Sequence, residues 1–196
     1  NELVLTAALD QVARWRDAGV LVPVAVNVFA PSLSDPALPD AVVRELRERG
    51  LPCDILTVEI TEDLLLGNHE RTRAVIERLR ASGVRVAIDD FGSGYSALSY
   101  LRELHVDELK LDRGFVTAVR GDRRAAAIVR AVIDLARELG LTTVAEGVED
   151  AETATLLKDY GCQVAQGFLY SPPLCPQDAF SLLWSRRSAP DATISS

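Results

Sequence analysis

Short apolar, β-branched segments alternate with longer amphipathic segments along almost the whole chain. Apolar residues at helical spacing in the longer segments predict helices, several of which end at a glycine, as at Gly50 and Gly140. This alternation predicts a parallel sheet with right-handed crossovers. The predicted strands are Leu21–Phe29, Ile55–Thr61, Val84–Asp89, Glu108–Asp112, Thr142–Glu146 and Val164–Tyr170. The predicted helices are Glu2–Asp17, Pro39–Arg49, His69–Ser82, Tyr95–Leu104, Arg123–Leu139 and Ala151–Tyr160.

A charged or amide residue stands near the carboxyl end of nearly every predicted strand. In a (β/α)8 barrel these ends converge on one rim, where active sites are built. In an open doubly wound sheet only the crevice at the switch point would be available, and no dinucleotide-type glycine loop follows the first strand. The pattern therefore favours an α/β fold of the TIM-barrel type. The residues concerned are Asn27, Glu59, Asp89, Lys110, Glu146 and Gln166.

The six predicted strands are too few for that fold. A complete barrel has eight strands and typically about 250 residues, whereas this chain has 196 residues and begins within a helical pattern. We therefore expect a (β/α)8 TIM-like barrel over residues 1–187 whose first strands are absent from this chain. Residues 188–196 are small and polar and include a proline, which predicts a flexible tail.

Composition narrows the functional classes. A formal net charge of -8 and a pI near 4.8 argue against binding of a DNA or RNA polymer, which relies on a basic surface. Three widely spaced cysteines, Cys53, Cys162 and Cys175, fit neither a disulfide framework nor a zinc site and indicate a reduced, cytoplasmic protein. No apolar stretch reaches the roughly 18 residues needed to span a bilayer, so no membrane segment is expected here.

Asp89 and Asp90 end an apolar run and precede the glycine-rich turn at Gly92 and Gly94. Adjacent ionised carboxylates repel each other, and a hard divalent cation such as Mg²⁺ relieves that repulsion. The alternative is that the two acids cap the following helix or lie in a solvated turn.

Strand alternation extends the candidate site. Lys110 and Asp112 share one face of their strand, and so do Thr57, Glu59 and Thr61. The oxygen donors of the rim suit one or two Mg²⁺ or Mn²⁺ ions, which in paired sites lie about 3.5–4 Å apart and activate a water for attack on a phosphodiester. Lys110 could hold that water, and Glu146 or Glu149 could accept its proton. These oxygen donors are Asn27, Glu59, Asp89, Asp90 and Glu146.

Six motifs in order along the chain resemble the EAL domain family, the magnesium-dependent phosphodiesterases of cyclic di-GMP, which are built on a modified (β/α)8 barrel. The motifs are Val26-Asn27, Glu59-Ile-Thr-Glu62, Asp89-Asp-Phe-Gly-Ser-Gly-Tyr-Ser96, Leu109-Lys-Leu-Asp112, Ala145-Glu-Gly-Val-Glu149 and Gln166-Gly-Phe168. The resemblance implies Mg²⁺ or Mn²⁺ as cofactor and cyclic di-GMP as ligand.

The resemblance also implies roles for individual residues. Lys110 would contact the nucleophilic water, and Glu146 would be a metal ligand that is also a candidate base. The other implied metal ligands are Asn27, Glu59, Asp89 and Asp90, and the implied ligand-binding or loop-supporting residues are Glu62, Asp112, Glu149 and Gln166. The segment Gly92–Leu104 resembles the family's dimerisation and gating element, which implies a possible homodimer.

The departures from the family pattern keep a second function open. The Glu-Ala-Leu motif, whose glutamate is a metal ligand in the family, does not occur in this chain, and Phe29 stands where serine is common. The main interpretation is hydrolysis of cyclic di-GMP to the linear dinucleotide. The alternative is a catalytically inactive module that binds cyclic di-GMP or a protein partner. For these 196 residues alone we expect little or no hydrolysis.

Overall fold

One parallel sheet, in which the strands follow one another in chain order, organises the structure. This computed structural model describes residues 2–61, 69–92, 101 and 104–188. An unbroken sequential order has no switch point, so the topology is that of a barrel and not of a doubly wound sheet. The strands are β1 (Val24–Asn27), β2 (Leu56–Thr61), β3 (Arg85–Phe91), β4 (Glu108–Leu111), β5 (Thr142–Ala145) and β6 (Val164–Ala165).

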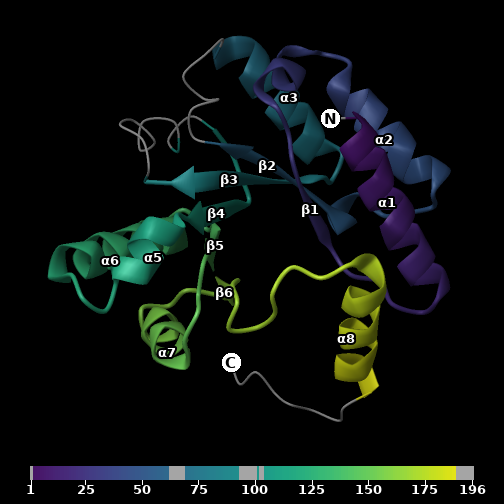
Figure 1. Ribbon diagram of the computed structural model, residues 1–196. Helices are drawn as coiled ribbons and strands as arrows, with labels where there is room; N and C mark the ends of the chain where they lie inside the picture. The colour runs from purple at the N-terminus through teal and green to yellow at the C-terminus, as the bar shows by residue number, and fades with distance from the viewer. Residues whose placement is uncertain (1, 62–68, 93–100, 102–103, 189–196) are drawn as a thin grey trace.

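The sheet is curved into a half-barrel, and helices cover it from outside (Figure 1). α1 packs beside β1, α3 beside β3 and α6 beside β5. Each covering helix presents an apolar stripe, as in α6, where Ala125, Val129, Ile133 and Ala136 are buried at helical spacing. The described helices are α1 (Glu2–Asp17), α2 (Leu38–Glu48), α3 (His69–Ala81), α5 (Arg113–Ala118), α6 (Arg123–Glu138), α7 (Ala151–Asp159) and α8 (Pro176–Ser188), with 3-10 turns η1 (Ala30–Ser34) and η2 (Cys53–Ile55).

The predicted fold class is confirmed, but the first and last strands were predicted too long. Instead of Leu21–Phe29, β1 covers only Val24–Asn27, after Pro23, which has no N–H to donate to a ladder. Instead of Val164–Tyr170, β6 ends at Ala165. There the chain turns tightly over Val148, and a Cβ on Gly167 would lie 2.2 Å from the Val148 carbonyl oxygen.

Two helices were missed at the sequence level. α5 begins directly after β4, because Asp112 accepts a hydrogen bond from the amide of Gly114 (2.8 Å) and so caps a helix instead of extending the strand. α8 has almost no amphipathic pattern, and its residues Pro176–Arg186 are exposed or half-buried. The predicted helix Tyr95–Leu104 and the tail lie largely outside the described residues, although Ser188 ends α8.

Asp107 ties the amino end of the sheet together. Its carboxylate pairs with Arg80 of α3 (2.8 Å) and accepts from the amide of Val86 (2.9 Å). Its own backbone accepts from Thr142 at the start of β5 (3.0 Å). Burial alone would raise the pKa of Asp107, but the hydrogen bonds from Arg80 and Val86 outweigh burial and hold the pKa below its ordinary value.

We expect Asp107→Asn to lower the free energy of unfolding by about 1–3 kcal/mol at pH 7, since a charged acceptor with several partners is lost. A depressed carboxyl pKa stabilises the folded state above the ordinary aspartate value near 3.9, and that contribution disappears as the pH falls through the lower folded-state pKa. Urea unfolding from pH 7 to pH 2.5 measures the difference between the two proteins.

The matched control is Asp134→Asn, which removes an exposed carboxylate paired with Arg137 on the same helix. Such surface pairs contribute little to stability, so the free energy of unfolding of this variant should differ from that of the wild type by less than about 0.5 kcal/mol. Equal losses in the two variants, or a loss for Asp107→Asn that does not depend on pH, would contradict the assignment.

Candidate metal and catalytic site

The candidate site lies at the carboxyl ends of the central strands. Glu59 comes from β2, Asp89 from β3 and Lys110 from β4, while Glu146 follows β5 directly. The parallel register pairs Thr61 with Asp89 and Leu111 with Ala145, which brings these ends to one level of the sheet. The residues predicted from separate motifs therefore meet at one rim.

The ammonium group of Lys110 lies at the centre of the site. Its Nζ is 2.7 Å from Oε1 of Glu59, 2.9 Å from Oδ1 of Asp89 and 2.6 Å from Oε1 of Glu146. The lysine side chain is only 7% exposed. Burial lowers the pKa of Lys110, but the hydrogen bonds to Glu146, Glu59 and Asp89 outweigh burial and raise it, so this lysine is a cation at neutral pH.

Glu59 links the site to the first strand. Nδ2 of Asn27 donates to Oε2 of Glu59 at 3.1 Å, between two residues that are also paired in the β1–β2 register. Burial raises the pKa of Glu59, the contact with Lys110 opposes that rise, and repulsion from Asp89 and Glu146 adds to it. The site therefore holds more negative charge than Lys110 balances.

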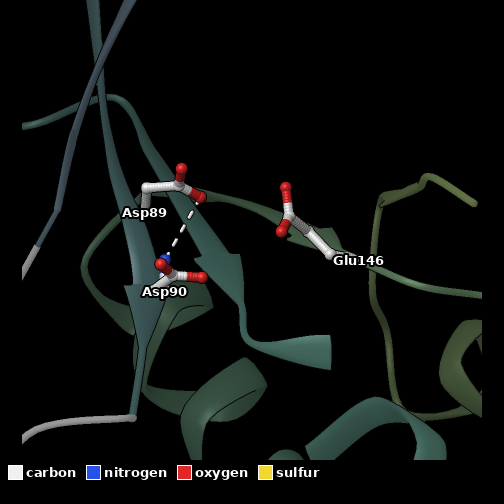
Figure 2. Close-up of side chains that lie close together, drawn as sticks. All are labelled: Asp89, Asp90 and Glu146. Atoms are coloured by element: carbon white, nitrogen blue, oxygen red, sulfur yellow. Dashed lines mark hydrogen bonds between the residues drawn. The ribbon is translucent and has the colours of Figure 1, made fainter. Parts of the chain in front are cut away.

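A local irregularity lets two adjacent aspartates face the same space. In a regular strand neighbouring side chains point to opposite faces. Here the register between β3 and β4 shifts between Ile88 and Phe91, and Asp90 has a φ of 54°. The amide of Asp90 donates to Oδ1 of Asp89 at 3.1 Å, and both carboxylates face Glu146 (Figure 2).

Asp89, Asp90 and Glu146 fit a hard divalent cation. Each offers a carboxylate oxygen, and these oxygens lie within 4.8 Å of one another. Burial and repulsion from Asp89 and Asp112 raise the pKa of Asp90. Oxygen donors held together against their own repulsion are the type of site that Mg²⁺, Mn²⁺ or Ca²⁺ occupies. In the part of the chain that the structure describes, no second group of three such side chains is found.

The remaining predicted residues lie around this centre. Asp112 caps α5, and the exposed Glu149 pairs with Arg113 (2.6 Å). Gln166 has an exposed side chain and is bonded through its backbone to Ala145 and Val148. Glu62 and most of Gly92–Leu104 fall outside the described residues.

Arg113 is the residue that sequence reasoning missed. Its ion pair with Glu149 joins the first residue of α5 to the segment that follows β5. Gly147 has a φ of 68°, and a Cβ there would lie 2.3 Å from Cγ of Arg113. Spacing in the sequence could have indicated this pair. Arg113 stands three residues after Lys110, and Glu149 stands three residues after Glu146.

The sequence model of the EAL domain family matches residues 1–173 of this chain. The chain belongs to the EAL domain family. No helix among the described residues is long and apolar enough to cross a membrane.

Relatives of this EAL chain include two cyclic di-GMP phosphodiesterases. NbdA of Pseudomonas aeruginosa is 44% identical over 151 residues, which cover 77% of this chain and 19% of that protein. PdeR of Escherichia coli is 37% identical over 183 residues, which cover 93% of this chain and 28% of that protein. The chain thus spans about a fifth to a third of the length of the curated relatives it matches.

Solved EAL structures share the fold. The EAL domain of Mycobacterium smegmatis DcpA superposes with a TM-score of 0.88 at 42% identity, covering 93% of this chain and 82% of that one. A manganese and cyclic di-GMP complex of Klebsiella pneumoniae BlrP1 superposes with a TM-score of 0.81 at 33% identity, covering 87% of this chain and 43% of that one.

We expect Asp90→Asn to raise the metal-free free energy of unfolding by about 0.5–1 kcal/mol, because it removes a charge that Asp89 and Asp112 repel. Asparagine also tolerates the positive φ of this position. The same variant should bind Mn²⁺ more weakly. Thermal melts in a chelator and calorimetric Mn²⁺ titration measure the two effects, and a destabilised metal-free variant would contradict this account.

Proposed function

We propose that the protein carrying this chain hydrolyses one phosphodiester bond of cyclic di-GMP to give the linear dinucleotide. The observation that carries the proposal is the meeting of Glu59, Asp89 and Glu146 around Lys110 at the carboxyl edge of the sheet. Family membership supports the substrate, since several relatives are named for this activity.

The chain's own residues supply the binding and proton-handling groups. Asp89, Asp90 and Glu146 would hold the cation, with Asn27 and Glu59 beside them. When bound, Mg²⁺ or Mn²⁺ lowers the pKa of a water and neutralises the phosphate. Mn²⁺ and Ca²⁺ are present in BlrP1 complexes, which supports a divalent cation for this chain.

Lys110 and Glu146 are suited to the reaction itself. Lys110 stays protonated, so its positive charge would stabilise the negative charge that develops on the attacking water and on the phosphate oxygens. Glu146 is the least buried of the three carboxylates around the lysine, which suits a group that exchanges a proton with water.

The remaining roles are also proposals. Asp112 and Glu149 would support the turns around the site, and Gln166 would lie beside the ligand. A homodimer through Gly92–Leu104 rests on the family resemblance. A cytoplasmic location rests on the three free cysteines.

The alternative function, a binding module without turnover, rests on the missing glutamate of the Glu-Ala-Leu motif and on the altered segment Phe29–Ser32. Phe29 is 67% exposed, while Asn27, two residues earlier, keeps its bond to Glu59. The departure at this position therefore leaves the acid cluster intact, which favours the hydrolase.

We expect Lys110→Ala and Asp89→Asn to lower kcat at least about 10³-fold in a protein extended toward the N-terminus, because each removes a group assigned to transition-state charge or to the cation. Conversion of cyclic di-GMP to the linear dinucleotide, followed by chromatography with and without Mg²⁺, measures this. The 196-residue chain alone should show little or no turnover.

Asp134→Asn is the control for the activity assay, since it lies on α6 in an exposed ion pair. Near-wild-type rates in Lys110→Ala would show that its role is misassigned. Tight cyclic di-GMP binding without hydrolysis in the extended wild-type protein would favour the regulatory module.

We expect Phe29→Ser to change KM for cyclic di-GMP while leaving Mn²⁺ affinity unchanged, since the exposed ring lies outside the acid cluster but at the same strand end. Steady-state kinetics in the extended protein and Mn²⁺ titration separate the two effects. Leu139→Ser is the control, because it also replaces an exposed apolar side chain with serine, at a position just after α6. An altered Mn²⁺ affinity in Phe29→Ser would place the ring inside the metal site.

A further inference from the structure

The cation at the centre of the acid cluster is chemically unusual for this chain. The sequence contains 21 lysines and arginines, of which Lys110 and Lys158 are the two lysines. Arginine presents a planar fork that matches one carboxylate, whereas an ammonium is a compact charge with three donors. Lys110 contacts three carboxylates at 2.6–2.9 Å, one for each of its N–H bonds.

The charges around Lys110 do not balance. Glu59, Asp89 and Glu146 bring three negative charges to one positive charge, and their side chains are 10%, 12% and 21% exposed. Buried like charges are costly unless they are paired. Lys110 is therefore the group that makes the close approach of these carboxylates tolerable, yet it leaves enough excess negative charge to attract a divalent cation.

Two of the carboxylates that contact Lys110 belong to the cluster that fits a metal. Asp89 and Glu146 contact the lysine and also lie within the group of three acids completed by Asp90. An ammonium and a divalent cation that share carboxylates compete for the same negative charge. Binding of the second cation must then weaken the hold of the first.

We propose that Lys110 is a built-in counter-cation, which assembles the acid cluster before a metal binds and sets an upper limit on divalent-cation affinity. This inference rests on the metal site of the proposed function and goes beyond it, because it gives Lys110 a role that needs no substrate. A lysine that acted only on the attacking water would not be needed to hold the carboxylates together in the metal-free chain.

The two expected effects of Lys110→Met have opposite signs. Methionine keeps most of the side-chain volume and removes the charge, so three carboxylates are left close together without their cation. In a chelator the midpoint of thermal unfolding should fall by about 5 °C or more. Mn²⁺ and Mg²⁺ should bind about tenfold more tightly, or better, because the competing charge is gone.

Calorimetric titration of the metal-free chain with Mn²⁺ or Mg²⁺, together with melts in a chelator, measures both effects. The matched control is Lys158→Met on α7, the other lysine, whose side chain is exposed; it should change neither quantity. Lys110→Met that binds cations no more tightly than wild type, or that melts at the wild-type temperature, overturns the proposal.

A measurement on the wild-type chain covers the case in which Lys110→Met does not fold without metal. Lysine-selective isotope labelling gives two side-chain ammonium environments, since the chain has two lysines. Titration with diamagnetic Mg²⁺ should shift the Lys110 signals and leave those of Lys158 in place. Saturation with Mg²⁺ that leaves Lys110 unmoved overturns the proposal.

The outcomes also separate this inference from the proposed function. Wild-type chain that binds neither Mn²⁺ nor Mg²⁺ at millimolar concentration contradicts the metal site, and with it both proposals. Normal cation binding with unchanged affinity in Lys110→Met contradicts only the counter-cation role.

Discussion

The arrangement of the site depends on one ammonium group that lies among three carboxylates. Lys110 approaches Glu59, Asp89 and Glu146 within 2.9 Å, and each acid comes from a different strand or strand end. Without a cation at the centre, mutual repulsion would drive these strand ends apart. The same arrangement makes the site attractive to a divalent cation, because one lysine balances only part of the charge.

The half-barrel is built so that these side chains converge. Sequential parallel strands place their carboxyl ends along one edge, and the register holds Glu59, Asp89 and Lys110 near one level. The bulge in β3 then turns Asp90 back toward the site beside Asp89. A regular strand would have sent Asp90 to the opposite face, and the cluster of three acids in Figure 2 would not exist.

The charged residues at the two ends of the sheet have different roles. At the amino end the Asp107 carboxylate is satisfied by Arg80 and by the backbone amide of Val86, so its charge stabilises the fold. At the carboxyl end the acids are under-neutralised, which makes that end costly for stability and suited to binding a divalent cation. This division is the usual one in barrels of this class, in which active sites lie at the carboxyl ends of the strands.

Local patterns in the sequence were sufficient to predict the fold class and six strands, because strand alternation and strand-end polarity are visible without tertiary contacts. They also predicted that polar residues near the strand ends, among them Glu59, Asp89 and Lys110, would lie at one rim. The sequence also indicated the family through ordered motifs. Three features became visible only in the folded chain: Lys110 contacts three acids at once, a bulge brings Asp90 beside Asp89, and Glu149 pairs with Arg113. These features depend on distances between separate strands and on one positive φ, and a linear pattern specifies neither.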